Sequence, residues 1–199
     1  ETAPQVRTQV IASLGAVGGE EAQTILLALL SSGEKDEVLA SLNALLLQKT
    51  MEVPFGNIVA LFEGESDPVQ RTVLGSLLAK YADTLESDRT FADQLLTEAS
   101  AGINSTDLAV RGLSINLYTA LAKYTDDPSE SLIGLYSGLN LKEQAAHPTL
   151  FQEITKLTED TQAKEVVENT LNNTASASTL RWQAADALFS AGDSEPVYN

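Results

Sequence analysis

The stretch DPVQRTVLGSLLAKY, residues 67–81, decides the fold because it combines a helix start, an apolar face and an arginine in a fixed order. Asp67 is a natural N-cap. Pro68 suits the first helical position, where its missing N–H costs nothing. Arg71 follows at the fourth helical step. The same layout recurs along the chain, which indicates a repeated architecture.

Aligning the chain on this arginine gives the repeat length. The aligned positions are separated by 32, 32, 40, 40 and 30 residues. Spacings of about 30–40 residues are typical of helix pairs that form the units of a solenoid. The aligned residues are Arg7, Leu39, Arg71, Arg111, Phe151 and Arg181.

Each interval predicts two amphipathic helices, and no alternating pattern predicts a strand. Gly18 and Gly19 suit the left-handed turn that ends the first helix. The predicted fold is all-α: an α–α superhelix of about five helix pairs plus a terminal helix, in one domain over residues 1–199. The first helices are predicted over 4–18, 36–49, 67–81, 106–124, 147–157 and 178–192, and the second helices over 20–31, 54–63, 88–102, 129–139 and 161–173.

Three segments resemble the first half of a HEAT repeat, with its Asp-Pro start, Val-Arg step and Leu-Gly ending. They are DPVQRTVLGSLLA (67–79), TDLAVRGLSINLYTAL (106–121) and PQVRTQVIASLG (4–15). The second and fifth units lack the arginine. The resemblance implies a HEAT-like solenoid that presents a concave surface to another macromolecule. It also implies a ladder between repeats, in which arginines reach neighbouring aspartates or the ends of nearby helices: Arg7, Asp67, Arg71, Asp107, Arg111 and Arg181.

Composition limits the partners. The chain is 43% hydrophobic, so it is not disordered, and its formal charge of −16 repels nucleic acid and anionic lipid surfaces. The longest apolar runs, such as residues 25–30, are too short to span a bilayer, which predicts a soluble chain without membrane insertion. Cysteine is absent, which excludes disulfides and a thiol nucleophile.

The two ends of the sequence suggest processing or a larger context. The opening ETAPQ has no initiator methionine, which favours a mature exported chain, periplasmic or extracellular, after removal of a signal peptide. The last unit lacks a second helix, which is also consistent with a fragment of a longer chain.

Few residues favour catalysis. The sole histidine, His147, cannot form a two-histidine metal site, and no GxSxG motif is present. DDPSE (126–130) lacks the pattern of a calcium loop. Acidic residues cluster before the predicted helices, where they cap helix N-termini and complement the dipole. We therefore expect no enzyme activity, cofactor or metal.

The resemblance implies that the second helices line the inside of the curve, where their polar faces would form an acidic strip. Trp182 is expected in the core or over the open end of the last unit, and becomes a binding hot spot if exposed. The candidate partner-binding residues are Asp93, Thr97, Glu98, Glu165, Glu168, Asn172 and Trp182.

These observations predict a non-enzymatic scaffold that binds a protein or peptide of basic character through an acidic concave surface. One alternative is an enzyme-associated HEAT-like protein, such as a chromophore binder of the pigment-lyase type. Another is a structural spacer within a larger protein. A homodimer through the terminal helix is a further expectation.

Overall fold

The computed structural model describes residues 4–32 and 34–192, which form thirteen α-helices and one 3-10 helix, with no strand in that part of the chain. The elements are α1 (Pro4–Val17), α2 (Glu20–Ser32), α3 (Lys35–Leu47), α4 (Phe55–Gly64), α5 (Pro68–Leu78), α6 (Ala82–Ser87), α7 (Arg89–Ile103), α8 (Leu108–Leu121), η1 (Ala122–Tyr124), α9 (Pro128–Gly138), α10 (Leu141–Ala146), α11 (Pro148–Thr155), α12 (Thr161–Asn172) and α13 (Ser178–Ser190).

The prediction of an all-helical chain is confirmed, and every helix predicted from the sequence is present. The short elements α6, η1 and α10 were not predicted. They explain the unequal repeat length: α6 lies between α5 and α8, and η1 and α10 lie between α8 and α11. These are the two intervals of 40 residues.

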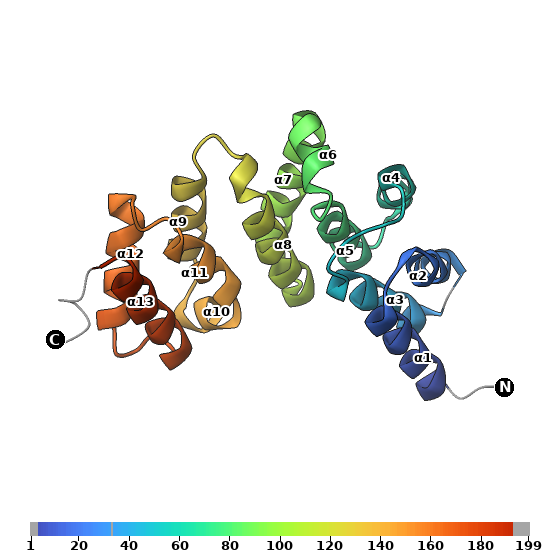
Figure 1. Ribbon diagram of the computed structural model, residues 1–199, viewed down its shortest axis with the longest axis horizontal. Coiled ribbons are helices and arrows are strands. Elements are labelled where there is room, and N and C mark those ends of the chain that lie inside the picture. Colours follow the sequence, from blue (N-terminus) through green and yellow to red (C-terminus); the bar gives the residue numbers. More distant parts are fainter. Residues whose placement is uncertain (1–3, 33, 193–199) are drawn as a thin grey trace.

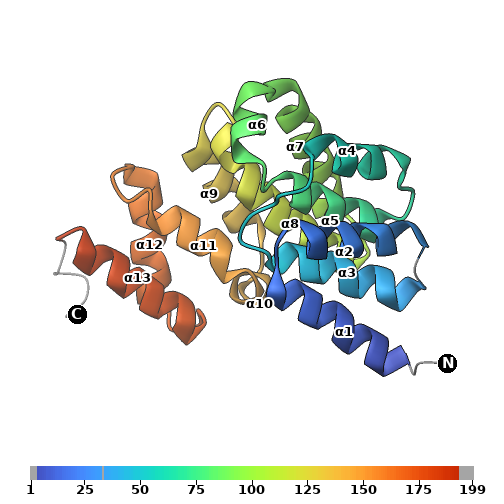
Figure 2. The ribbon, with the colours of Figure 1, turned by 45° about the vertical axis from the view of Figure 1, so that its right-hand side comes forward.

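The helices lie in two layers that curve into an arch (Figure 1). The inner layer, on the hollow side, consists of α1, α3, α5, α8, α11 and α13, with α10 beside α11. The outer layer consists of α2, α4, α7, α9 and α12, with α6 beside α7. Figure 2 shows α1 and α3 along the lower edge, and α4, α6 and α7 along the upper edge. Each long inner helix packs against the next inner helix.

The first helices of the units therefore line the hollow side, and the expectation that the second helices do so is wrong. Small residues explain the close packing of the inner row. A Cβ at Gly15 of α1 would lie 2.8 Å from the Cβ of Ala44 on α3, and one at Gly75 of α5 would lie 3.1 Å from Leu117 on α8. In the outer layer, a Cβ at Gly134 of α9 would meet nothing within 4 Å. A Cβ at Gly102 of α7 would lie 2.0 Å from the Oγ of Ser114 on α8, so the outer layer packs closely onto the inner row at this point.

Two clusters of buried side chains form the core. The first extends from α1 to α8 and includes Phe62, and the second extends from α8 to α13 and includes Phe151. Helix α8 joins them, because Leu117 belongs to the first cluster and Ile115 to the second. The junction between the two clusters thus lies at the middle of the arch.

Local signals in the sequence explain where the helices begin and turn. Asp67 accepts hydrogen bonds from two backbone N–H groups at the start of α5, and Asp107 and Asp160 do the same for α8 and α12. Gly18 and Gly19 have φ values of 70° and 87° between α1 and α2. This backbone is strained for other residues, so the predicted glycine turn is confirmed.

Candidate functional site

The recurring arginine occupies the fourth residue of α1, α5, α8 and α13, all in the inner layer. The guanidinium of Arg71 lies 4.2 Å from the ring centre of Phe62 and donates a 2.8 Å hydrogen bond to the Phe62 carbonyl near the end of α4. Arg181 donates to the carbonyl of Leu171 near the end of α12. In both cases the arginine bonds the C-terminal end of the preceding outer helix, where carbonyls lack helical partners and the dipole favours a cation.

The acidic partners of the arginines are glutamates. Arg7 pairs with Glu37 at 2.7 Å, Arg71 with Glu98 at 2.6 Å, and Arg111 with Glu143 at 2.9 Å. The expectation that Asp67 and Asp107 pair with the arginines is wrong, because these carboxylates cap their own helices. The alternative, contact with nearby helix ends, is confirmed for Arg71 and Arg181.

The predicted acidic strip lies on α7 and α12, in the outer layer (Figure 1). Asp93 and Glu165 are exposed, and so are Thr97 and Asn172. Two members already have cationic partners: Glu98 pairs with Arg71, and Glu168 lies 3.9 Å from Lys164. The strip therefore lies on helices of the outer layer, and its Glu98 reaches Arg71 of the inner helix α5.

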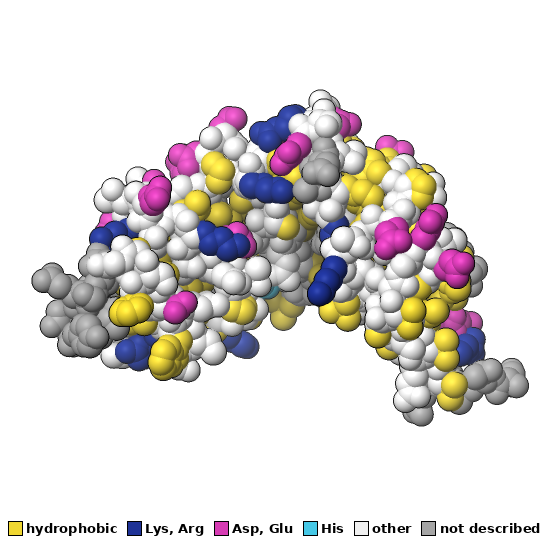
Figure 3. All heavy atoms as spheres, viewed as in Figure 1, with side chains coloured by type: hydrophobic (Ala, Val, Ile, Leu, Met, Phe, Trp, Pro, Cys, Tyr) yellow, Lys and Arg dark blue, Asp and Glu magenta, His cyan; other side chains and the backbone are white. Residues whose placement is uncertain are grey.

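The two layers differ in charge. By sequence, the outer helices carry ten acidic and two basic residues, whereas the inner helices carry five acidic and six basic residues. Figure 3 shows the acidic side chains mainly along the outer curve and basic side chains around the hollow beneath the arch. The concave side is therefore the less acidic side of a strongly acidic protein.

Lysines follow the ends of four successive inner helices. Lys49, Lys80 and Lys123 lie two residues after the ends of α3, α5 and α8, and Lys156 lies one residue after the end of α11. Lysine at this position complements the helix dipole. The Lys80 ammonium also donates to carbonyls of Leu46 and Gln48 at the end of α3, and burial lowers its pKa.

A cavity of about 490 Å³ lies among α8, η1, α9 and α11, beside the second core cluster. Its apolar lining includes Ala120, Leu132 and Leu157. Lys123 and Lys156 line it too, and both are exposed. Lys123 lies 4.8 Å from the ring centre of Tyr124, and Lys156 pairs with Glu153. Glu153 lines the cavity as well, so its two lysines and one glutamate leave a net charge of one positive unit beside apolar walls, which suits a ligand that is both apolar and anionic. We call this cavity the inner groove.

His147 stands beside the inner groove, between α10 and α11. Its Nδ1 lies 3.0 Å from the Oδ1 of Asn116, which lines the groove from α8. Burial lowers the pKa of His147, and the charge of Glu143 partly opposes this effect. The neutral imidazole of His147 therefore links the residue before α11 to Asn116 of α8. This agrees with the helix-capping or loop position expected for His147 from the sequence.

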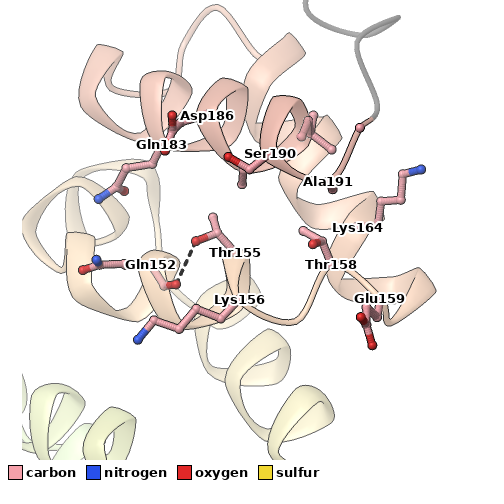
Figure 4. Close-up of a pocket in the computed structure, with 13 residues that line it drawn as sticks. Gln152, Thr155, Lys156, Thr158, Glu159, Lys164, Gln183, Asp186, Ser190 and Ala191 are labelled. Atoms are coloured by element: carbon pink, nitrogen blue, oxygen red, sulfur yellow. Dashed lines mark hydrogen bonds between the residues drawn. The ribbon is translucent and has the colours of Figure 1, made fainter.

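A larger and more polar cavity, of about 710 Å³, lies among α11, α12 and α13 (Figure 4). Gln152 and Gln183 extend toward each other from opposite sides. Thr155 donates its hydroxyl hydrogen to the carbonyl of Gln152. The buried Oε1 of Gln183 has no hydrogen-bond partner among the described residues. The lining holds polar side chains of both charges but no nucleophile paired with a base.

Trp182 lies on the exposed face of α13 with 76% of its surface accessible, so of its two expected places the core is wrong, and its role as a binding hot spot stays a prediction. Within residues 4–32 and 34–192, no group of three or more histidine, aspartate or glutamate side chains could hold a metal ion. In the same part of the chain, none of the helices has the length and apolar character needed to cross a membrane.

Comparisons of the chain with protein-family models, with curated proteins and with solved structures each find no match. The resemblance to HEAT repeats therefore rests on the residues of this chain.

The lysines and the inner groove were missed from the sequence. Lysine one or two residues after a predicted helix end was a visible signal for the lysines. The inner groove had no such signal, because its lining comes from α8, η1, α9 and α11, which only the folded chain brings together.

Proposed function

We propose that the protein is a HEAT-like α-solenoid that binds another protein without catalysing a reaction. Support for the repeat comes from the alternation of inner and outer helices and from the arginine at the fourth residue of four inner helices. Proteins built from stacked helix pairs typically offer long concave surfaces for binding. We propose that the hollow side of the arch is that surface.

The partner presents a segment that is apolar on one side and carries carboxylates. One observation carries this proposal: Lys123 and Lys156 flank an apolar groove at the middle of the arch. Grooves of this kind accept an amphipathic helix, whose apolar face is buried while charged groups at the rim set the orientation. The inner groove would therefore take an anionic partner, in place of the basic partner inferred from the sequence.

The test is a fluorescence-anisotropy titration with a labelled amphipathic peptide built from leucine and glutamate. Binding should weaken as salt rises and should fall about tenfold or more in the double variant Lys123→Glu/Lys156→Glu. Lys164→Glu on outer helix α12 is the control for half of this change in net charge, −2 against −4 in the double variant, and should bind within about twofold of the parent. Equal affinity for a peptide with lysine in place of glutamate would overturn the proposal.

A second candidate partner is a basic protein that binds the outer layer. The excess of ten acidic over two basic residues on the outer helices favours it, because such a field attracts cations over long distances. The exposed Asp93 and Glu165 are the members of the predicted strip to reverse, since Glu98 and Glu168 have cationic partners. Unchanged affinity of Asp93→Lys/Glu165→Lys for a polylysine peptide would exclude this candidate.

The chromophore-binding and spacer alternatives, and an exported location, stay predictions. A tetrapyrrole titration followed by absorbance tests the chromophore alternative, since binding in a pocket shifts the spectrum. No shift would exclude it.

A further inference from the structure

The cavity of about 710 Å³ among α11, α12 and α13, called here the polar cavity, takes no part in binding at the inner groove. Pockets that hold small molecules span roughly 300–1,000 Å³, so its size suits a small ligand. Helix α11 lines both cavities, and Lys156 is the one described residue that belongs to both linings. The polar cavity is therefore a separate site with a chemistry of its own.

One end of the polar cavity carries two side-chain amides. Gln152 of α11 and Gln183 of α13 extend toward each other there (Figure 4). The Oε1 of Gln183 is buried and has no hydrogen-bond partner among the described residues. A buried acceptor without a donor is unfavourable, so this oxygen favours a ligand that brings an O–H or N–H group to it.

Hydroxyl groups line the rest of the polar cavity. Thr155 and Ser190 lie on opposite sides of its middle, and Thr158 lies toward the end away from the amides (Figure 4). The Thr155 hydroxyl donates to the carbonyl of Gln152, so it offers a ligand an acceptor. Amides and hydroxyls together present both donors and acceptors. A ligand that is itself rich in hydroxyls matches them, because each hydroxyl both donates and accepts.

The charged side chains of the lining do not select a charged ligand. The ammonium groups of Lys156 and Lys164 already lie beside glutamates, at 2.6 and 3.9 Å. Glu159 and Asp186 are exposed to solvent. The charged ends of Lys156, Lys164 and Glu159 point away from the middle of the cavity (Figure 4). Two cations and two anions also balance, so the interior of the cavity is polar without net charge.

We infer that the polar cavity binds a neutral sugar. One sugar hydroxyl donates to the Oε1 of Gln183, and others bond the hydroxyls of Thr155 and Ser190. The C–H groups of the sugar ring lie on Ala187 and Ala191, which give the cavity an apolar surface. This inference goes beyond the binding of a protein and does not depend on the inner groove.

Heteronuclear NMR of the 199-residue chain, titrated with maltose, tests the inference. The side-chain amide signals of Gln152 and Gln183 should shift and reach saturation. The affinity should be equal at low and high salt, because the ligand is neutral. Gln183→Leu, followed through the Gln152 signal, should bind about tenfold more weakly because it lacks the buried acceptor. The backbone signals of this variant show whether it is folded.

Gln70→Leu is the matched control, because Gln70 is a half-buried glutamine of the inner helix α5, outside the cavity. It should bind maltose within about twofold of the parent. Fully O-methylated maltose keeps both rings but has no donor, and it should not bind.

Shifts that grow linearly with maltose, alike in the parent and in Gln183→Leu, would overturn the inference, because they would indicate a solvent effect with water alone in the cavity. Equal affinity for O-methylated maltose would also overturn it. Neither result bears on the peptide titration, since Gln183 and Gln70 do not line the inner groove.

Discussion

The inner and outer layers of the arch have the same secondary structure but differ in packing and charge. Inner helices approach closely through Gly15 and Gly75, whereas Gly134 of the outer layer has open space beside it. Inner helices are followed by lysines, and outer helices carry most of the acidic residues. The difference teaches that packing along a row and charge follow the same division: neighbouring inner helices touch at glycines and four of them are followed by lysines, whereas the outer helices touch the inner row at points such as Gly102 and carry most of the acidic residues.

The largest expected effect comes from filling the closest inner contact. A valine at Gly15 would press on Ala44, including its backbone atoms at 3.1 and 3.3 Å, which cannot move aside as a flexible side chain could. Gly15→Val should lower the free energy of unfolding by about 3 kcal/mol. Urea denaturation measures this loss. A variant as stable as the parent would show that α1 does not depend on this contact.

Next in size is the loss of an arginine that joins the layers. Arg71→Met should cost about 2 kcal/mol, because the Phe62 carbonyl and the Glu98 carboxylate both lose a charged donor. Glu98→Gln removes only the half-exposed ion pair and should cost at most about 1 kcal/mol. Urea denaturation of both variants gives the comparison. Equal losses would mean that the bond to the end of α4 contributes nothing.

The outer layer should respond to a glycine substitution in the opposite direction. Gly134→Ala lies inside α9 with nothing near its Cβ position, so the gain in helix propensity is unopposed. We expect an increase of about 0.8 kcal/mol in the free energy of unfolding. Destabilisation of this variant would contradict the picture of a loosely packed outer layer.

The smallest expected effect is a pH dependence at the junction of the two core clusters. Burial lowers the pKa of His147 below its value of 6.5, so the unfolded chain binds the proton more readily. This contribution to stability is complete above pH 6.5 and is lost as the pH falls through the lower pKa of the folded state. His147→Gln lacks this titration.

Thermal melts between pH 8 and pH 5 measure the melting temperatures of the parent chain and of His147→Gln. Because both proteins contain the same carboxylates, the difference between them reports the titration of His147. The melting temperature of the parent chain should fall relative to that of His147→Gln across this range. If the melting temperatures of the two proteins changed with pH in parallel, this would contradict a lowered pKa of His147 in the folded state.

The sequence was sufficient to predict where the helices lie along the chain. It was insufficient to predict which helices form the inner layer and which form the outer layer. Apolar periodicity and caps such as Asp67 are local signals, so the helix positions were predictable. Which helix of each pair lines the hollow side depends on contacts between distant residues, such as Gly15 with Ala44, and no local pattern records them. The acidic strip was therefore placed in the wrong layer, although Asp93, Thr97, Glu165 and Asn172 are exposed on α7 and α12 and only Glu98 and Glu168 are partly buried.

Chemical footprinting of the lysines tests the central claim, that the inner groove is the binding surface, most directly. The chain is acetylated with and without the leucine–glutamate peptide, and the modified sites are counted by mass spectrometry. Lys123 and Lys156 should become several-fold less reactive when the peptide is bound, whereas Lys164 on the outer layer should react equally in both states. Protection of Lys164 with Lys123 and Lys156 unprotected would contradict the account.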